Sequence, residues 1–257
     1  MNNELRNHVI KLLNSNVRLD GRKPTEYREV SVEPGVIRSA EGSARVKIGK
    51  TEVIAGVKTE VMQPYPDQED QGSIMVGVEL LPLSSPNFET GPPSIQAIEL
   101  ARVVDRGIRE SKTLDFKSLC IEEGEKVWML IIDICVINEA GNLFDASALA
   151  AVTALKNMQF PKYEDGKLDH KEKTDKKLEM NDTPVTVTVL KIGDKFVTDP
   201  DSDEEKVIDA RLTVASLSDG TLCAMQKGGD TPLSQEEISK MVDIATEKAQ
   251  ELRKLIK

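Results

Sequence analysis

The stretch VWMLIIDICVINEAGNLFDASALAAVTALKNM, at residues 127–158, decides the fold class. Its first part, 127–137, is an apolar run broken only by Asp133, which predicts a buried strand. A glycine turn, AGNL at 140–143, follows, and the alanine-rich part from Asp145 to Met158 predicts a helix. A strand, a tight turn and a helix start together can present free backbone N–H groups to an anion.

The glycine turn has the position of a phosphate site without the side chains of one. Binding and reacting phosphate also needs a hydroxyl and a fixed cation beside the turn. Here the turn continues with the amide of Asn142 and the aliphatic side chain of Leu143. We therefore expect a turn that forms but does not activate phosphate.

Composition predicts an ordinary globular protein of one large domain or two small ones. Of the 257 residues, 39% are hydrophobic and 30% charged, and the longest apolar run is too short and too interrupted to cross a bilayer. We expect no membrane segment and no secretion signal. The net charge of -10 argues against a free-standing nucleic-acid binder, so any RNA contact must be local or shared with a basic partner.

Cysteine and histidine usage excludes several kinds of site. Cys120, Cys135 and Cys223 are far apart and flanked by apolar residues, which predicts buried thiols in a reducing cytoplasm. Only His8 and His170 are present, both in polar surroundings. Two histidines make a catalytic triad or a histidine–metal centre an unfavoured interpretation. We expect a cytoplasmic protein without metal or cofactor.

Four regions follow from the patterning, and they predict an α+β fold of two β-sheet/helix halves packed in one subunit. Residues 1–26 form an N-terminal helix and turn, and residues 27–161 form a first half of strands and helices. Residues 162–181 are almost wholly charged and predict a mobile connector. Residues 182–257 form a second half of strands, closed by a helix that begins with the capping-box pattern Ser-Gln-Glu-Glu at 234–237.

A stripe of arginines on the helix predicted from about residue 94 to Lys112 is a candidate binding site. Arg102, Arg106 and Arg109 share one face and can hold successive phosphates. The same helix places Glu99, Asp105 and Glu110 at ion-pair spacing from these arginines. Spacing alone therefore favours a solvated face of surface ion pairs.

An acidic cluster between two predicted strands is a second candidate. Paired carboxylates near a turn can hold Mg2+ or supply an acid. Acidic loops are more often solvated turns that discourage edge pairing, and we favour that interpretation. The cluster consists of Asp199, Asp201, Asp203, Glu204, Glu205 and Asp209.

Five motifs spread over nearly the whole chain resemble the RNase PH family. More narrowly, they are similar to the non-catalytic RNase PH-like subunit of the archaeal exosome ring. The motifs are RLDGR at 18–22, EGSA at 41–44, ELLPL at 79–83, ELARVVDR at 99–106 and DARLTV at 209–214.

The resemblance implies an RNase PH-like fold and a place in a ring of six, where three copies alternate with three of a catalytic partner. RNA-binding cap subunits would cover this ring, which would degrade single-stranded RNA from its 3′ end with phosphate. Catalytic family members carry Ala-Gly-Ser-Arg at the glycine turn, and adjacent arginines at the start of the helix that here begins near Ser94. This chain has neither, and the resemblance therefore implies no catalytic residues.

The resemblance also bears on the two candidate sites. It matches Arg102 and Arg106 to positions that touch RNA. Arg109, on the same stripe, is a further candidate for RNA contact. Asp203 and Asp209 have the spacing of the family's paired aspartates, so an active phosphorolytic exoribonuclease that uses them is the alternative. A third possibility is an assembly factor that does not contact RNA.

Overall fold

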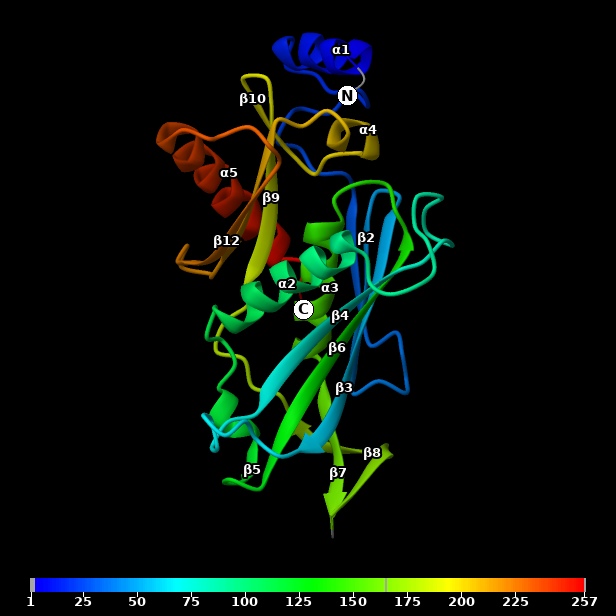
Figure 1. Ribbon diagram of the computed structural model, residues 1–257, viewed down its shortest axis with the longest axis vertical. Helices are drawn as coiled ribbons and strands as arrows, with labels where there is room; N and C mark the ends of the chain where they lie inside the picture. Colours follow the sequence, from blue (N-terminus) through cyan, green and yellow to red (C-terminus); the bar gives the residue numbers. More distant parts are fainter. Residues whose placement is uncertain (1–2, 165, 257) are drawn as a thin grey trace.

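A buried helix, α3 (Leu143–Lys156), lies between two β-sheets at the centre of the computed structural model (Figure 1). The structure describes residues 3–164 and 166–256. Nearly every α3 residue is buried, and its small side chains let the neighbouring strands approach closely. At Gly42, a Cβ atom would collide with the carbonyl oxygen of Ala154 on this helix. The alanine-rich pattern therefore encodes a helix covered on all sides rather than an amphipathic one.

The first sheet has the order β1-β2-β3-β6-β4, and β5 also pairs with β6. Its pairs are antiparallel except β4 with β6. The apolar run of the sequence forms β6, which lies between β3 and β4, and its continuous hydrophobicity reflects this central place. The strands are β1 (Val30–Pro34), β2 (Gly42–Ile48), β3 (Thr51–Met62), β4 (Ser73–Leu80), β5 (Cys120–Glu122) and β6 (Lys126–Asn138).

The second sheet is antiparallel, with the order β10-β9-β11-β12. Its helix α5 (Gln235–Arg253) packs on β9 and β11, and the expected capping box is formed by Ser234 and Glu237. The helix α2 (Ile95–Arg109) packs on β4 and reaches β9 and β12, so it joins the two sheets. The strands are β9 (Val185–Ile192), β10 (Lys195–Thr198), β11 (Ala210–Ser216) and β12 (Leu222–Gly228).

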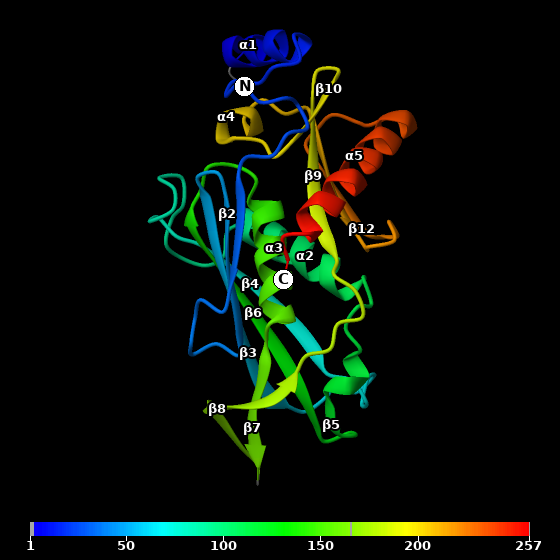
Figure 2. The ribbon, with the colours of Figure 1, turned by 180° about the vertical axis from the view of Figure 1, so that it is seen from behind.

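The N-terminal helix α1 (Asn3–Asn14) packs beside β10 and lies at one end of the molecule (Figures 1 and 2). Its apolar face joins a small separate core with the second sheet, formed by Val9, Leu13, Ile192, Val197 and Val207. The short α4 (Ser202–Glu205) lies at the same end of the molecule. The α+β architecture expected from the sequence is confirmed.

The expectation that residues 162–181 form a mobile connector is wrong. β7 (Gln159–Glu164) and β8 (Lys167–Lys177) form an antiparallel hairpin. Tyr163 lies edge-on to Trp128 with ring centroids 5.9 Å apart, and Lys176 lies over the ring of Phe160. Most β8 side chains are exposed, and the strand forms through its pairing with β7 and through the charge of Lys176 above the Phe160 ring.

The expectation that the three cysteines are buried also needs correction. Cys120, Cys135 and Cys223 are free but only half-buried, and burial raises the pKa of the Cys135 and Cys223 thiols. Trp128 is a core residue, 6% exposed. Within the described ranges, no helix is long and apolar enough to cross a membrane.

Candidate functional site

The glycine turn between β6 and α3 has the sharp backbone that the sequence predicts. Gly141 and Asn142 have φ values of 88° and 62°, in the left-handed region. A Cβ atom at Gly141 would collide with the carbonyl oxygen of Pro200, because the loop that leads into α4 packs against the turn. Glycine is therefore required at this position both for its backbone conformation and for space.

The N–H groups of the turn already have anionic partners within the chain. The N–H of Gly141 donates to Oε1 of Glu139, and the N–H of Asn142 donates to Oε1 of Glu205, each over 2.9 Å. Burial of Glu205 raises the pKa of its carboxyl to about 7. The donors that a bound phosphate would need are thus occupied by carboxylates of the protein itself.

The side chain of Asn142 ties the turn to two buried aspartates. Its Nδ2 donates to Oδ2 of Asp145 and to Oδ1 of Asp199, each over 3.0 Å. Asp145 also accepts a 2.6 Å hydrogen bond from the hydroxyl of Tyr27. Burial raises the pKa of Asp145 to about 7, and burial beside Asp145 raises the pKa of Tyr27. The amide of Asn142 therefore holds two buried aspartates in place, at the position next to the turn where a phosphate site would need a hydroxyl.

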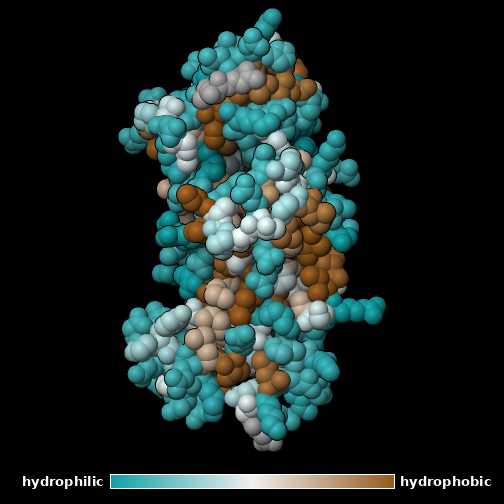
Figure 3. Space-filling model, turned by 45° about the vertical axis from the view of Figure 1, so that its right-hand side comes forward, coloured by the Kyte–Doolittle hydropathy of each residue, from teal (hydrophilic) through white to brown (hydrophobic). Residues whose placement is uncertain are grey.

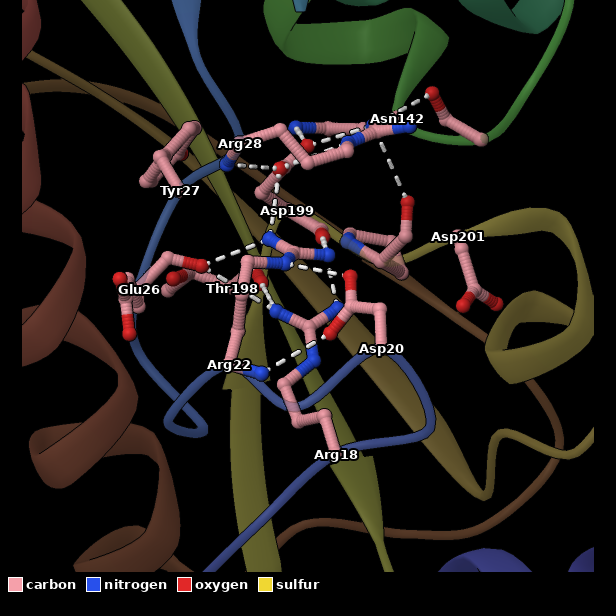
Figure 4. Close-up of polar contacts among 12 residues, drawn as sticks. Arg18, Asp20, Arg22, Glu26, Tyr27, Arg28, Asn142, Thr198, Asp199 and Asp201 are labelled. Atoms are coloured by element: carbon pink, nitrogen blue, oxygen red, sulfur yellow. Dashed lines mark hydrogen bonds and ion pairs between the residues drawn. The ribbon is translucent and has the colours of Figure 1, made fainter. Parts of the chain in front are cut away.

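Arginines do lie near the turn, but they bind Asp199 (Figure 4). Arg28 donates from Nη2 to Oδ1 of Asp199 over 2.6 Å and from Nη1 to the carbonyl oxygen of Ala140 over 2.7 Å. Arg22 donates from Nη1 to Oδ2 of Asp199 over 2.8 Å. Burial opposes the charge of Asp199, yet the hydrogen bonds and charge of Arg28 outweigh it and lower the pKa of Asp199. These guanidinium groups hold the chain together instead of facing a ligand.

The expectation of a solvated acidic turn is wrong for most of the cluster. Glu204 is buried and paired with the buried Arg18, whose guanidinium also donates to the carbonyl oxygens of Thr198 and Asp199. The N-terminal segment is thereby fixed to the second sheet. The cluster is a docking point for residues that precede β1 in the sequence.

The two aspartates of the catalytic alternative have separate partners. Asp209 accepts both from Nη2 of Arg6 on α1 and from the N–H of Gly193. Asp203 is exposed and pairs with Lys206 on the same short helix, which fits the solvated interpretation. No residue of the described ranges bonds to both aspartates.

Arg102 and Arg106 are exposed on α2 without an acidic side chain within 4 Å among the residues that the structure describes. They line a groove of about 300 Å³ between α2 and the second sheet, together with residues such as Thr213 and Gln226. Both guanidinium groups are therefore available to a ligand.

The surface ion pairs expected on α2 form only in part. Arg109 does pair with Asp105, at 2.9 Å, and also donates to the carbonyl oxygen of Ile74. Its hydrogen bonds with Asp105 raise the pKa of Arg109. Glu99 instead pairs with Arg211 of β11, and this leaves Arg102 free.

Sequence reasoning missed Arg211, whose guanidinium lies 4.1 Å from the ring centroid of Phe144. It also missed the roles of Glu139, Glu205 and Arg28. Glu205 was visible as a member of the acidic cluster, but its partner is 63 residues earlier in the chain. No local pattern specifies such a pairing.

The chain is similar to known proteins over almost its full length. Residues 26–161 match the model of the 3′ exoribonuclease family, domain 1, and residues 182–248 match domain 2. Exosome complex component Rrp42 of Methanocella arvoryzae is 48% identical over 96% of this chain and 94% of that protein. The corresponding protein of Methanothermobacter thermautotrophicus is 45% identical over 96% of this chain and 92% of that protein.

A solved structure gives the same result. A chain of the Archaeoglobus fulgidus exosome with RNA bound to the active site superposes with a TM-score of 0.92, at 45% identity, over 99% of this chain and 98% of that chain. The two-sheet architecture around α3, the glycine turn and both matched domains agree on one assignment. The chain belongs to the RNase PH family of 3′ exoribonucleases.

Proposed function

We propose that this protein is a non-catalytic subunit of an exosome that degrades RNA from the 3′ end with phosphate. The observation that carries the proposal is the occupation of the glycine turn by Glu139 and Glu205. A phosphate ion at the turn would have to displace both carboxyl groups, because the N–H donors that it needs are already bonded to them. The similarity to proteins named as exosome components supports the proposal that this chain works within an exosome.

The start of α2 gives independent support. Its N-cap is Ser94, whose hydroxyl accepts from the N–H of Ala97, and the first arginine on the helix is Arg102. Phosphoryl chemistry depends on fixed positive groups around the reacting oxygens. This chain supplies none at the helix start, so the catalytic groups would come from a related partner subunit.

Arg102 and Arg106 are the residues that we assign to RNA contact in this complex, and Arg109 has a weaker claim because it is bound to Asp105. Two unpaired guanidinium groups one helical turn apart suit successive backbone phosphates. They would lie close to the active site of the catalytic RNase PH-like partner, in a ring of three heterodimers under RNA-binding caps.

Surface chemistry fits assembly with a partner. Leu83 is 79% exposed and Ile95 is 87% exposed, which is unusual for large apolar side chains. On the face seen in Figure 3, hydrophobic residues gather across the middle of the molecule between hydrophilic ends. The three free thiols are consistent with the reducing cytoplasm that the proposal assumes.

Release of nucleoside diphosphates from RNA and phosphate tests the proposal. The assay compares this chain alone, the catalytic partner alone and the assembled complex. We expect activity only when the partner is present and no activity in the chain alone, even after Asn142→Ser and Leu143→Arg are combined. Activity of the unmodified chain that is lost on Asp209→Asn would support the catalytic alternative instead.

A further inference from the structure

A cavity at the end of the molecule opposite α1 and α4 has the features of a second ligand site. It has a volume of about 900 Å³ and lies between the loop that joins β1 to β2 and the strand β8. Figures 1 and 2 both show this loop beside β8. Small-molecule sites typically have volumes of roughly 300–1,000 Å³, so this open cavity has room for a ligand of nucleotide size.

The cavity is basic although the protein is acidic. Four permanent cations line it, against a single carboxylate, and the side chains concerned are Arg38, Lys58, Lys171, Lys173 and Glu41. The net charge of the whole chain is -10, so this concentration of positive charge is local. A concave basic surface raises the local concentration of anions.

Two of the cations build the cavity and two remain free. Lys58 donates to the carbonyl oxygen of Ser39 over 2.9 Å and to Glu41 over 2.8 Å, and Lys173 donates to the carbonyl oxygen of Ala40 over 2.6 Å. Arg38 and Lys171 are exposed and have no acidic partner within 4 Å in the part of the chain that the structure describes. They can therefore bind an anion without losing an existing bond.

The single carboxylate specifies a second kind of ligand group. The Glu41 side chain is 1% exposed, and its Oε1 accepts from Lys58 and lies 2.9 Å from Nδ1 of His170. Its Oε2 is buried without a hydrogen-bond partner among the described residues. A buried acceptor of this kind is costly unless a donor binds it, and sugar hydroxyls are donors that glutamate and aspartate bind in nucleotide sites.

We propose that this cavity binds a ribose phosphate, with the phosphate on Arg38 and Lys171 and a ribose hydroxyl on the carboxylate of Glu41, whose buried Oε2 turns toward the cavity when the ligand binds. The ligand is a free nucleotide or one nucleotide of an RNA strand, since both carry the same groups. The site is separate from the arginines of α2 and does not depend on the function proposed above.

Calorimetric titration of the full-length chain with adenosine 5′-diphosphate tests this site. We expect saturable binding that weakens about tenfold or more in Arg38→Gln/Lys171→Gln, because two charge-assisted contacts are lost. Lys240→Gln/Lys254→Gln, which removes two exposed cations of the α5 region, should bind like the unmodified chain. Absence of binding, or equal binding by the Arg38/Lys171 variant, would overturn the proposal.

Further ligands test the ribose contact separately from the phosphate contact, and distinguish a free nucleotide from RNA. Glu41→Gln should weaken binding of the diphosphate but not of inorganic pyrophosphate, which has no hydroxyl for residue 41; equal losses for both would refute the role of Glu41. Circular dichroism and melting of each variant identify a folding defect. A single-stranded RNA that displaces the diphosphate from the unmodified chain, and that itself binds the Arg38/Lys171 variant more weakly, identifies RNA as the source. A diphosphate site that RNA does not displace identifies the free nucleotide.

Discussion

The N–H of Asn142 donates a 2.9 Å hydrogen bond to the carboxyl group of Glu205. This bond brings a side chain of the second matched domain to the glycine turn between β6 and α3. The turn keeps its shape while its N–H groups bind carboxyl groups of the chain itself.

Removal of Arg102 and Arg106 tests the RNA contact. In the assembled complex, changing both to Ala should weaken RNA binding by roughly 1–3 kcal/mol and make its salt dependence shallower, because charge-assisted bonds to phosphates are lost. Binding is measured by fluorescence anisotropy at several salt concentrations. The control is Lys240→Ala/Lys254→Ala, which removes the same charge from the α5 region.

Assembly of the Arg102/Arg106 variant should be unaffected, since α2 packs through Ala97, Leu100, Val104 and Ile108. Ile98 on the same helix is 48% exposed, so the packing face does not include it. Unchanged RNA affinity in an intact complex would leave only the assembly role for this chain.

Two buried acids should make stability depend on pH. The pKa values of Asp145 and Glu205 are raised to about 7 from 3.8 and 4.5, mainly by burial. Their folded forms keep protons that the unfolded chain loses, so stability is greatest below about pH 4 for these groups and falls as pH rises to about 7. In Asp145→Asn, melting temperatures between about pH 5 and about pH 8 should fall less steeply than in the unmodified chain. An identical slope would show that Asp145 is ionised in the folded protein.

The β7–β8 hairpin should contribute to stability. Replacing residues 166–177 by a short Gly/Ser turn removes the bonds of Lys173 to Ala40 and of Thr174 to Phe160, and uncovers the Phe160 ring. We expect a loss of about 1–3 kcal/mol, seen as a melting temperature several degrees lower. Substituting only the exposed Lys167 and Asp175 by Ser is the control. An unchanged melting temperature would mean that the segment is dispensable, as its composition suggests.

The pair of Arg18 and Glu204 should be among the most sensitive positions. Both side chains are almost fully buried, and Arg18→Ala would leave Glu204 as an unpaired buried charge. A loss of about 3–5 kcal/mol is expected, measured by denaturant unfolding. Arg18→Lys should recover only part of it, because an ammonium cannot reproduce the fork of bonds to Glu204, Thr198 and Asp199. Full recovery by lysine would show that charge alone is required.

Sequence patterns predicted the fold well where the signal is local. The apolar run of β6 and the capping box of Ser234 each depend on neighbouring residues. The hairpin was missed because its stabilising contacts come from Trp128, Ala40 and Glu41, far away in the sequence.

The glycine turn shows the same limit within the site. The residues at 142 and 143 were enough to predict that the usual hydroxyl and cation are missing. That Glu205 and Glu139 fill the turn depends on how α4 packs against it, which no periodicity encodes. Likewise, Arg102 is free only because Glu99 binds Arg211, 112 residues later.

The central position of α3 has a consequence for synthesis of the chain. This helix contacts β2 and β3, which precede it, and also β9, which the ribosome makes later. A nascent chain that ends before Val185 therefore carries a helix with one apolar face uncovered. We expect such a chain to need protection from aggregation until the second sheet emerges, so the two family domains mature as one cooperative unit rather than in succession.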